Sequence, residues 1–231
     1  MDVFEEGLQC LNEKILKMGC LVKEAIKNSI HALTDRNNVL ARKVINDEHL
    51  IDALDVEIGE ECIRLTALCQ PDAIDIGFIT TAMKVTSELE RMGDLAVNIA
   101  ERAAELNEEP ELKSYINIPK MSDMAQGMTQ DVVNAFVRRD AQWATDVIAR
   151  VDEIDDLKVE ILKELSLLRA QDPSSVIRAI KISFIAQYLE RIADQATNIT
   201  EMLIYLVKGK IIKHTDRTLC RRIKSDLKAC K

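Results

Sequence analysis

A twelve-residue segment occurs twice in this chain, and the repeat constrains the fold more than any other feature. Residues 90–101 read ERMGDLAVNIAE and residues 190–201 read ERIADQATNITE, with seven identical positions at a constant shift of 100 residues. A second pair aligns at a shift of 103: VINDEHLIDALDVEI at 44–58 and VIARVDEIDDLKVEI at 147–161. Two matches in the same order indicate an internal duplication of one structural unit.

The chain also has the composition of long helices with few connections. Aromatic residues make up 3%, and the 231 residues include 7 Gly and 4 Pro. Pro71 and Gly209 mark helix ends, and the segment 110–119, with a proline at each end, is the best linker. The helices are expected at roughly 4–34, 37–69, 73–108, 120–138, 140–170 and 174–208.

Together these features predict an all-α fold of two tandem antiparallel three-helix bundles, because short turns between helices make neighbours antiparallel. The first repeat is expected at 1–109, the second at 120–209, and a basic C-terminal tail at 210–231. The tail is predicted as a short amphipathic helix or a partly disordered basic end.

Charge is distributed unevenly along the chain. Residues 208–231 contain nine Lys and Arg and two Asp, a net charge of +7. Because the whole chain has a net charge of −8, residues 1–207 have a net charge of −15. An acidic body argues against nucleic acid as a partner, since phosphate neutralisation needs a basic face. It suits cations or basic protein surfaces.

We expect no targeting signal in this chain. It has no run of 18 apolar residues, and its start, MDVFEEGLQ, has neither a basic nor an apolar signal region. We therefore expect no membrane insertion and a cytoplasmic location. The six cysteines form no CxxC pair and no zinc-like spacing, so we expect reduced thiols.

The repeated segment is expected to place its carboxylates on one stripe, roughly opposite the apolar core face. At about 100° per residue, Glu90, Asp94, Asn98 and Glu101 fall within about 80° of one another. The second copy repeats this arrangement with Glu190, Asp194, Asn198 and Glu201. Such carboxylates repel one another by about a few tenths of a kcal/mol per pair, a cost that a bound cation would relieve.

Oxygen ligands of this kind suit Mg, Ca, Mn or Fe, and Zn less typically. Glu48 and Asp52 form a second pair of acids four residues apart on the neighbouring helix, so the two pairs could converge on one cluster of cations. In the second unit Val151 stands in the place of Glu48, and Asp155 is the counterpart of Asp52. The alternative interpretation is a solvated acidic face that binds nothing.

Enzyme motifs are missing from the chain. It has no Gly-rich phosphate loop, nucleophile elbow or HExxH motif, and none of its three histidines has the E-x-x-H spacing of di-iron bundles. His49, within DEHLID, is a metal ligand or, in the favoured interpretation, a surface residue. We predict a protein that is not an enzyme, and two alternatives stay open: a structural adaptor without metal and a carboxylate-bridged metalloenzyme.

Six collinear segments resemble the PhoU family of phosphate-uptake regulators. They are MGCLVKEAI (18–26), VINDEHLIDALDVEI, QPDAID (70–75), LERMGDLAVNIAE, YLERIADQATNITE and IYLVKG (204–209). The resemblance implies two similar three-helix bundles, a tendency to dimerise, and a non-enzymatic cytoplasmic role in phosphate homeostasis. It also implies two partners: the ATPase subunit of the ABC phosphate transporter, and the membrane sensor histidine kinase that the family restrains when phosphate is plentiful.

The resemblance further implies multinuclear metal clusters on the outer acidic faces, with Fe as the first choice and Mn, Mg or Zn as alternatives. The matching positions are Glu48, Asp52, Glu90, Asp94, Asn98, Glu101, Asp155, Glu190, Asp194, Asn198 and Glu201. This chain departs from the family at two positions: Val151 stands where the second bundle usually has an acid, and Gly77 stands where many relatives have Arg. The departure at Val151 weakens the expectation of a full cluster in the second unit.

Overall fold

The computed structural model describes residues 3–69, 71–112 and 117–209, and within these ranges all regular structure is helical. The first half forms three long helices, α1 (Val3–Thr34), α2 (Asn38–Cys69) and α3 (Ala73–Asn107), as the sequence predicts. The helix α3 begins after Asp72, whose side chain accepts hydrogen bonds from the backbone amides of Ile74 and Asp75.

The second half follows the same order with one more interruption. Its helices are α4 (Asn117–Val137), α5 (Ala141–Ile148), α6 (Val151–Gln171), a single 3-10 turn η1 (Pro173–Ser175) and α7 (Val176–Lys208). The helix α4 begins inside the predicted linker 110–119, because Pro119 is tolerated in a first turn, where no backbone donor is required. The tail 210–231 lies outside the described residues.

The segment 140–170, predicted as one helix, is interrupted at residues 149–150. The amide of Arg150 donates to the carbonyl of Val147 at 3.1 Å, a tighter closure than an α-helical hydrogen bond. The Arg150 guanidinium also binds Asp131 of α4 at 2.5 Å. The chain therefore changes direction between α5 and α6 where an ion pair to another helix holds it.

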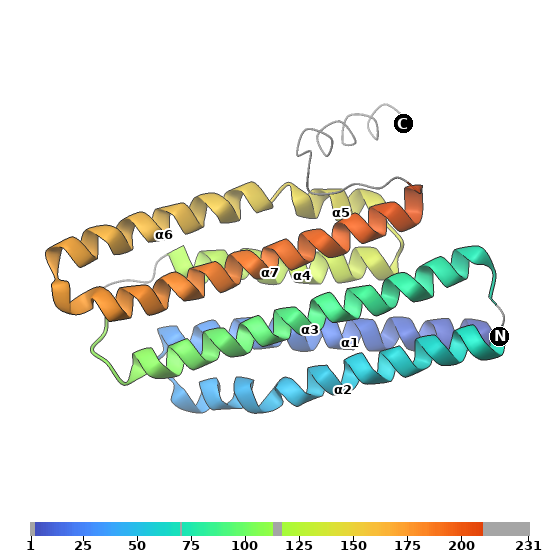
Figure 1. Ribbon diagram of the computed structural model, residues 1–231, viewed down its shortest axis with the longest axis horizontal. Coiled ribbons are helices and arrows are strands. Elements are labelled where there is room, and N and C mark those ends of the chain that lie inside the picture. Colours follow the sequence, from blue (N-terminus) through green and yellow to red (C-terminus); the bar gives the residue numbers. More distant parts are fainter. Residues whose placement is uncertain (1–2, 70, 113–116, 210–231) are drawn as a thin grey trace.

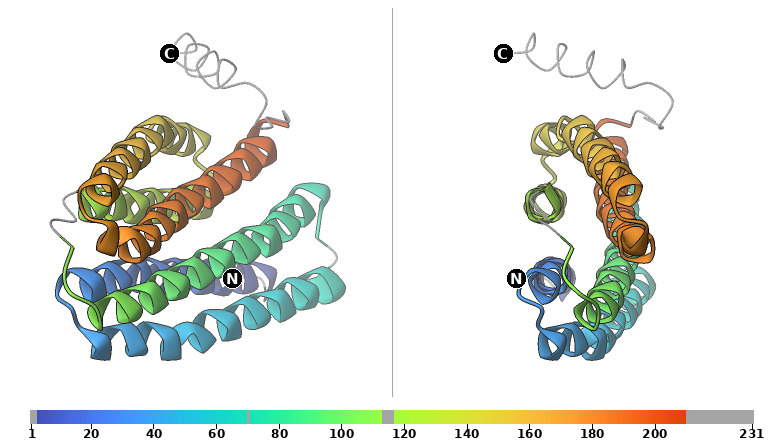
Figure 2. Two further views of the ribbon diagram at one scale, coloured as in Figure 1. Left: turned by 60° about the vertical axis from the view of Figure 1, so that its left-hand side comes forward. Right: turned by 90° about the vertical axis from the view of Figure 1, so that its left-hand side faces the viewer.

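The seven α-helices within the described ranges pack as two bundles that share a long seam (Figure 1). In the end-on view of Figure 2, α2, α3, α7 and α6 follow one another in an arc, and α1 and α4 lie together inside it. The seam is formed by α3 against α7 and by α1 against α4. Glu105 of α3 pairs with Lys181 of α7, and Glu88 with Asn198, so α3 and α7 run antiparallel.

The duplication is visible in the turns as well as in the sequence. Arg36, between α1 and α2, and Arg139, between α4 and α5, both take a left-handed backbone conformation, with φ of 52° and 53°. In each turn the next amide closes a hydrogen bond of 2.9 Å to the carbonyl five residues earlier: Asn37 to Ala32 and Asp140 to Ala135. Both units therefore end their first helix with the same Schellman-type turn.

The apolar faces predicted for the two repeated helices form the core. On α3 every predicted core residue is buried: Phe78, Val85, Leu89, Met92, Leu95, Ala96, Ile99, Ala103 and Leu106. On α7 the same holds for Ile185, Leu189, Ile192, Ala196, Ile199 and Leu203, while Leu206 is only partly buried. On α2 the helical period predicts an apolar face of Val44, Leu50, Ile51, Leu54 and Ile58. All of these are buried except Leu50, which is 41% exposed because it lies beside the face that packs on α3.

Candidate functional site

Glu48 is the centre of an acidic group between α2 and α3. Burial is the largest cause that raises the pKa of its carboxyl, and a hydrogen bond with the Asp94 carboxyl is the next. The negative charges of Asp94, Asp52 and Glu101 raise it further. The two predicted pairs, one from each helix, therefore lie close enough to repel one another.

Glu90 belongs to the same group and adds a residue that the sequence analysis missed. Burial raises the pKa of its carboxyl first, followed by the charges of Asp94, Asp52 and Asp55, while Arg91 opposes them. Asp55 lies seven residues after Glu48, so a helical period places both on the stripe that faces α3. This spacing is the sequence signal from which Asp55 could have been assigned to the acidic group.

The flanking polar side chains of α3 have specific partners. Arg91 donates to Glu88 at 3.2 Å, on the side of the helix toward the seam. The amide nitrogen of Asn98 donates to the backbone carbonyl of Asp94 at 2.8 Å, so its oxygen is the atom that a cation would take. Glu101 is exposed and lies 3.9 Å from a nitrogen of Arg102.

His49 takes the surface role that the sequence analysis favoured. Its Nδ1 lies 2.6 Å from the backbone carbonyl of Asn46, and a carbonyl only accepts hydrogen bonds, so this nitrogen donates. The ring is exposed. Nothing in this geometry turns the imidazole toward the acidic group.

The second unit places its acids differently. Lys158 of α6 donates to Glu190 of α7 at 2.5 Å. Asn198 donates to Glu88 of α3 at 3.1 Å and to Gln195 at 3.1 Å, so this amide lies at the seam between the bundles. The other predicted positions are half-buried for Asp155 and Glu201 and exposed for Asp194.

The donor set of the first unit fits a hard cation. It consists of carboxylate and amide oxygens. Burial and then the neighbouring acids raise the pKa of Glu48 and Glu90, and a positive charge would offset the part due to the acids. Across the described part of the chain, no three His, Cys, Asp or Glu side chains are gathered in an arrangement that could hold an ion as they stand. The site is therefore an open face on which α2 and α3 each contribute acids, rather than a closed cage.

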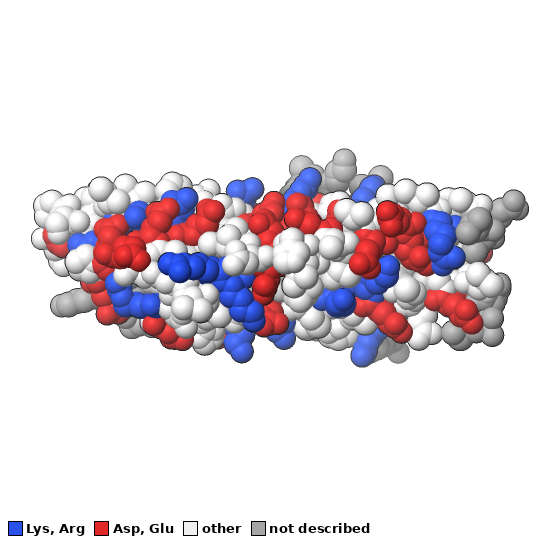
Figure 3. Space-filling view, turned by 90° about the horizontal axis from the view of Figure 1, so that it is seen from below, with Lys and Arg blue, Asp and Glu red and all other residues white. Residues whose placement is uncertain are grey.

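Acidic side chains form clusters along the length of one face of the molecule, among Lys, Arg and uncharged residues. Figure 3 shows this face from below, with Asp and Glu in long runs and clusters of Lys and Arg between them. Carboxylates concentrated on one surface raise the local concentration of cations and of basic partner surfaces. The picture agrees with the acidic body predicted from the sequence.

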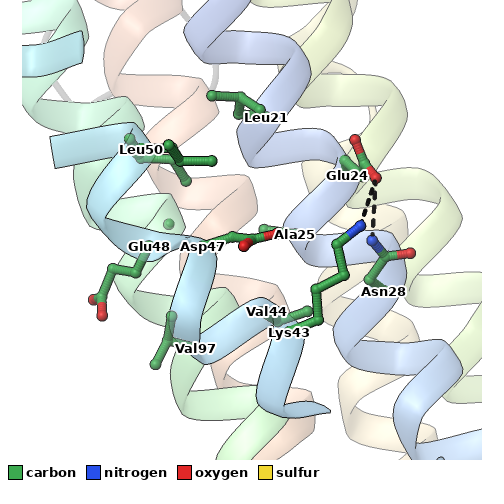
Figure 4. Close-up of a pocket in the computed structure, with 12 residues that line it drawn as sticks. Leu21, Glu24, Ala25, Asn28, Lys43, Val44, Asp47, Glu48, Leu50 and Val97 are labelled. Carbon is green, nitrogen blue, oxygen red and sulfur yellow. Dashed lines mark hydrogen bonds and ion pairs between the residues drawn. The ribbon is translucent and has the colours of Figure 1, made fainter. Parts of the chain in front are cut away.

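A shallow hollow lies beside this group, between α1 and α2 (Figure 4). Glu24 forms one edge, where it accepts from Asn28 at 3.4 Å and lies 4.0 Å from Lys43. In Figure 4 Asp47 is directed to the hollow, and the carboxylate of Glu48 points away from it, although Glu48 also contributes to the lining. The hollow and the acidic group therefore adjoin each other at Glu48.

Three cysteines, Cys10, Cys20 and Cys62, are free thiols among the side chains that the structure describes. Cys10 and Cys20 are exposed on α1, and Cys62 is buried on α2. Burial, with a smaller contribution from the Glu61 charge, raises the pKa of the Cys62 thiol to about 11, so it stays protonated. Cys220 and Cys230 lie outside the described residues.

Asp75, two residues before the departure at Gly77, has a partner from the other unit. Arg139 lies 3.7 Å from Asp75, and its guanidinium lies over the ring of Phe78 at 4.3 Å. Gly77 faces Leu206 of α7, and a Cβ there would lie 3.5 Å from that side chain. The start of α3 is thus fixed by side chains of the second unit.

Fold and site together define a class: a tandem-repeat protein of helical bundles with an acidic outer face. Within that class, the family described as the PhoU domain matches residues 15–103 and 118–203, once in each unit. The chain belongs to the PhoU family. The resemblance and the all-α two-bundle fold predicted from the sequence are confirmed.

Relatives of known sequence and structure extend over nearly the whole chain. The phosphate-specific transport system accessory protein PhoU homolog of Aquifex aeolicus is 44% identical over 214 residues, covering 93% of this chain and 96% of its own length. The homolog of the same description from Clostridium acetobutylicum is 34% identical and covers 93% and 98%. The crystal structure of PhoU from Pseudomonas aeruginosa has a TM-score of 0.85 at 35% identity, covering 90% of this chain and all of that one.

Among the residues that the structure describes, no helix combines the length and the apolar run that a membrane span requires.

Proposed function

We propose that this protein is a regulator of inorganic phosphate uptake and phosphate homeostasis. The observation that carries the proposal is the match of both units to accessory proteins of phosphate-specific transport, at up to 44% identity among the relatives described above. A duplicated helical bundle with acidic faces supports an adaptor role, because its long helices present extended surfaces to partners.

The partners proposed are the ATPase subunit of the ABC phosphate transporter and the membrane sensor histidine kinase of the phosphate response. When phosphate is plentiful, the protein restrains the transporter and holds the kinase in its non-activating state. It acts in the cytoplasm, as a homodimer and without catalysis. The absence of nucleophile, phosphate-loop and HExxH motifs from the sequence supports the non-enzymatic part.

A metal ion forms part of this proposal, and its place is the first unit. Carboxylates of both helices would hold it: Glu48, Asp52, Glu90, Asp94 and Glu101, with the oxygen of Asn98. Fe is the first choice, with Mn, Mg or Zn as alternatives. A cation there would neutralise the acids that raise the pKa of Glu48 and Glu90 and would tie α2 to α3.

Co-purification tests the adaptor role. Membranes containing both partners are prepared from cells grown in high phosphate, and the tagged chain is recovered from them. We expect the transporter ATPase or the sensor kinase to be recovered with it. Recovery of neither protein would refute the proposed function.

Elemental analysis tests the metal part separately. After mild purification we expect at least about one metal ion per chain, and the E90A/D94A variant is expected to lose most of it. The variant D156A/E160A is a matched control, because it removes two exposed acids at the same spacing from the outer side of α6. Equal metal loss in both variants would show that the bound metal is held by surface charge in general.

A further inference from the structure

The two units differ at the helix that faces the repeated acidic stripe. At the shift of 103 residues that aligns α2 with α6, Asp55 corresponds to Lys158 and Glu48 to Val151. Asp52 is retained as Asp155. The first unit therefore has three acids on this stripe, and the second has one acid, one apolar residue and one base.

Lys158 lies where a positive charge is needed. Its ammonium is 2.5 Å from the Glu190 carboxylate, and the two side chains are only 24% and 23% exposed. In the first unit the corresponding Glu90 faces Asp55, whose charge adds to the repulsion. One exchanged residue thus turns a repulsive contact between neighbouring helices into an attractive one.

We propose that the Lys158 ammonium is the built-in counter-cation of the second unit, so that the face between α6 and α7 binds no metal ion. This inference rests on the cation site proposed for the first unit. It implies that the protein binds metal only between α2 and α3. Bound metal then stabilises only the first bundle, while the second is held by its own side chains. The donor set of the second unit does not fit a metal cluster, because an ammonium already occupies the carboxylate of Glu190.

Two reciprocal variants test the proposal with Mn²⁺ as the probe. The variant E48V/D55K transfers the pattern of the second unit into the first, and V151E/K158D transfers the pattern of the first into the second. Each chain is stripped with EDTA, checked for helicity and titrated calorimetrically. We expect E48V/D55K to weaken Mn²⁺ binding by roughly ten-fold or more, and V151E/K158D to gain a second class of site.

Three outcomes separate this inference from the proposed site of the first unit. If E190A/D194A removes as much Mn²⁺ as E90A/D94A, the second unit holds a cation despite Lys158 and the inference is overturned. A folded V151E/K158D chain that gains no Mn²⁺ overturns it too. If the wild type binds no Mn²⁺ while V151E/K158D does, the role of Lys158 is supported and the site of the first unit is refuted.

Hydrogen exchange gives a readout that needs no engineered site. The variant K158M keeps an unbranched side chain of similar length and removes the charge. We expect faster amide exchange in α6, to the same extent in EDTA and in Mn²⁺, because the lost partner was internal. Two results would overturn the proposal. One is that amide exchange in α6 is the same in K158M as in the wild type, and the other is that Mn²⁺ restores slow exchange in K158M.

Discussion

Single carboxyl groups show most directly what the acidic face costs. The pKa of Glu48 lies above the ordinary value of 4.5, so the folded state holds this proton more tightly than the unfolded chain does. The stability that comes from this tighter proton binding is therefore fully present below pH 4.5. It is lost as the pH rises through the pKa of Glu48 in the folded state. At neutral pH the ionised Glu48 costs stability unless a cation neutralises it.

This cost predicts a stabilising substitution. In EDTA at neutral pH we expect Glu48→Gln to raise the free energy of unfolding by about half a kcal/mol, because it removes a partly screened like charge. The gain should vanish below pH 4.5, where wild-type Glu48 is protonated too. With saturating Mn²⁺ the order should reverse, since bound ligand stabilises only the chain that binds it. Urea unfolding measures all three, with E60Q, an exposed acid on α2, as the control.

The left-handed turn at Arg36 allows a second prediction at this scale. Its Nη2 donates to the carbonyls of Asn107 and Glu109, both at 2.6 Å, so the side chain ties the α1–α2 turn to the end of α3. Both Ala and Gly would remove these contacts, but only Gly relieves the strain of a positive φ. We expect R36A to be less stable than R36G by about 1 kcal/mol in thermal unfolding. Equal stabilities would argue against strain in this turn.

Among the helices, α5 depends most on its N-cap. It has only eight residues, and Asp140 accepts hydrogen bonds from the amides of Gln142 and Trp143 at 2.9 and 3.0 Å. We expect Asp140→Ala to lower the free energy of unfolding by about 1 kcal/mol and Asp140→Asn to lower it much less, since Asn caps nearly as well. If both variants lose the same amount, the charge rather than the cap is what matters.

The helices differ in how far the sequence could predict them. The long α3 was predicted closely because its apolar residues recur with the helical period, and because Asp72 follows a proline that cannot continue α2. The break between α5 and α6 has no Pro or Gly to announce it, since Ala149 and Arg150 are both compatible with a helix. It depends on the contact of Arg150 with Asp131, which only the packed fold creates.

The candidate site was predictable to a similar degree. The spacing of Glu48, Asp52, Glu90 and Asp94 was sufficient to place two acid pairs on facing helices. To predict the contact of Lys158 with Glu190, one must know that α6 packs against α7. The internal alignment of the two repeats is needed as well. The placement of Asn198 at the seam was not predictable, because its helical angle matches that of Asn98 while its neighbour across the seam, Glu88, belongs to the other unit.

At the scale of the whole molecule, the seam between α1 and α4 joins the two bundles through a close approach at a glycine. A Cβ added at Gly19 would lie 2.9 Å from Cγ2 of Val133, a buried branched side chain with little room to move. By contrast, a Cβ at Gly59 of α2 would meet nothing within 4 Å. The two positions therefore separate helix propensity from packing between the units.

Alanine at each glycine tests this difference. We expect Gly59→Ala to stabilise the chain by about 0.5 to 1 kcal/mol through propensity alone. Gly19→Ala gains the same propensity but forces the seam apart, at a cost of about 1 to 3 kcal/mol, so the net effect should be neutral to destabilising. Chemical denaturation gives the free energy of unfolding of both variants. If Gly19→Ala is as stable as Gly59→Ala, α4 can shift to accept the added methyl group without a cost in stability.

A double substitution tests whether that cost belongs to the seam itself. Val133→Ala removes the two methyl groups that a side chain at position 19 would strike, and by itself it leaves a void between α1 and α4. In G19A/V133A the new methyl group fills part of that void, so we expect a smaller loss of stability than the two single losses combined. The coupling should be about 0.5 kcal/mol or more in a double-mutant cycle. Additive losses would mean that the two bundles do not pack through Gly19, and the shared seam would then rest on α3 and α7.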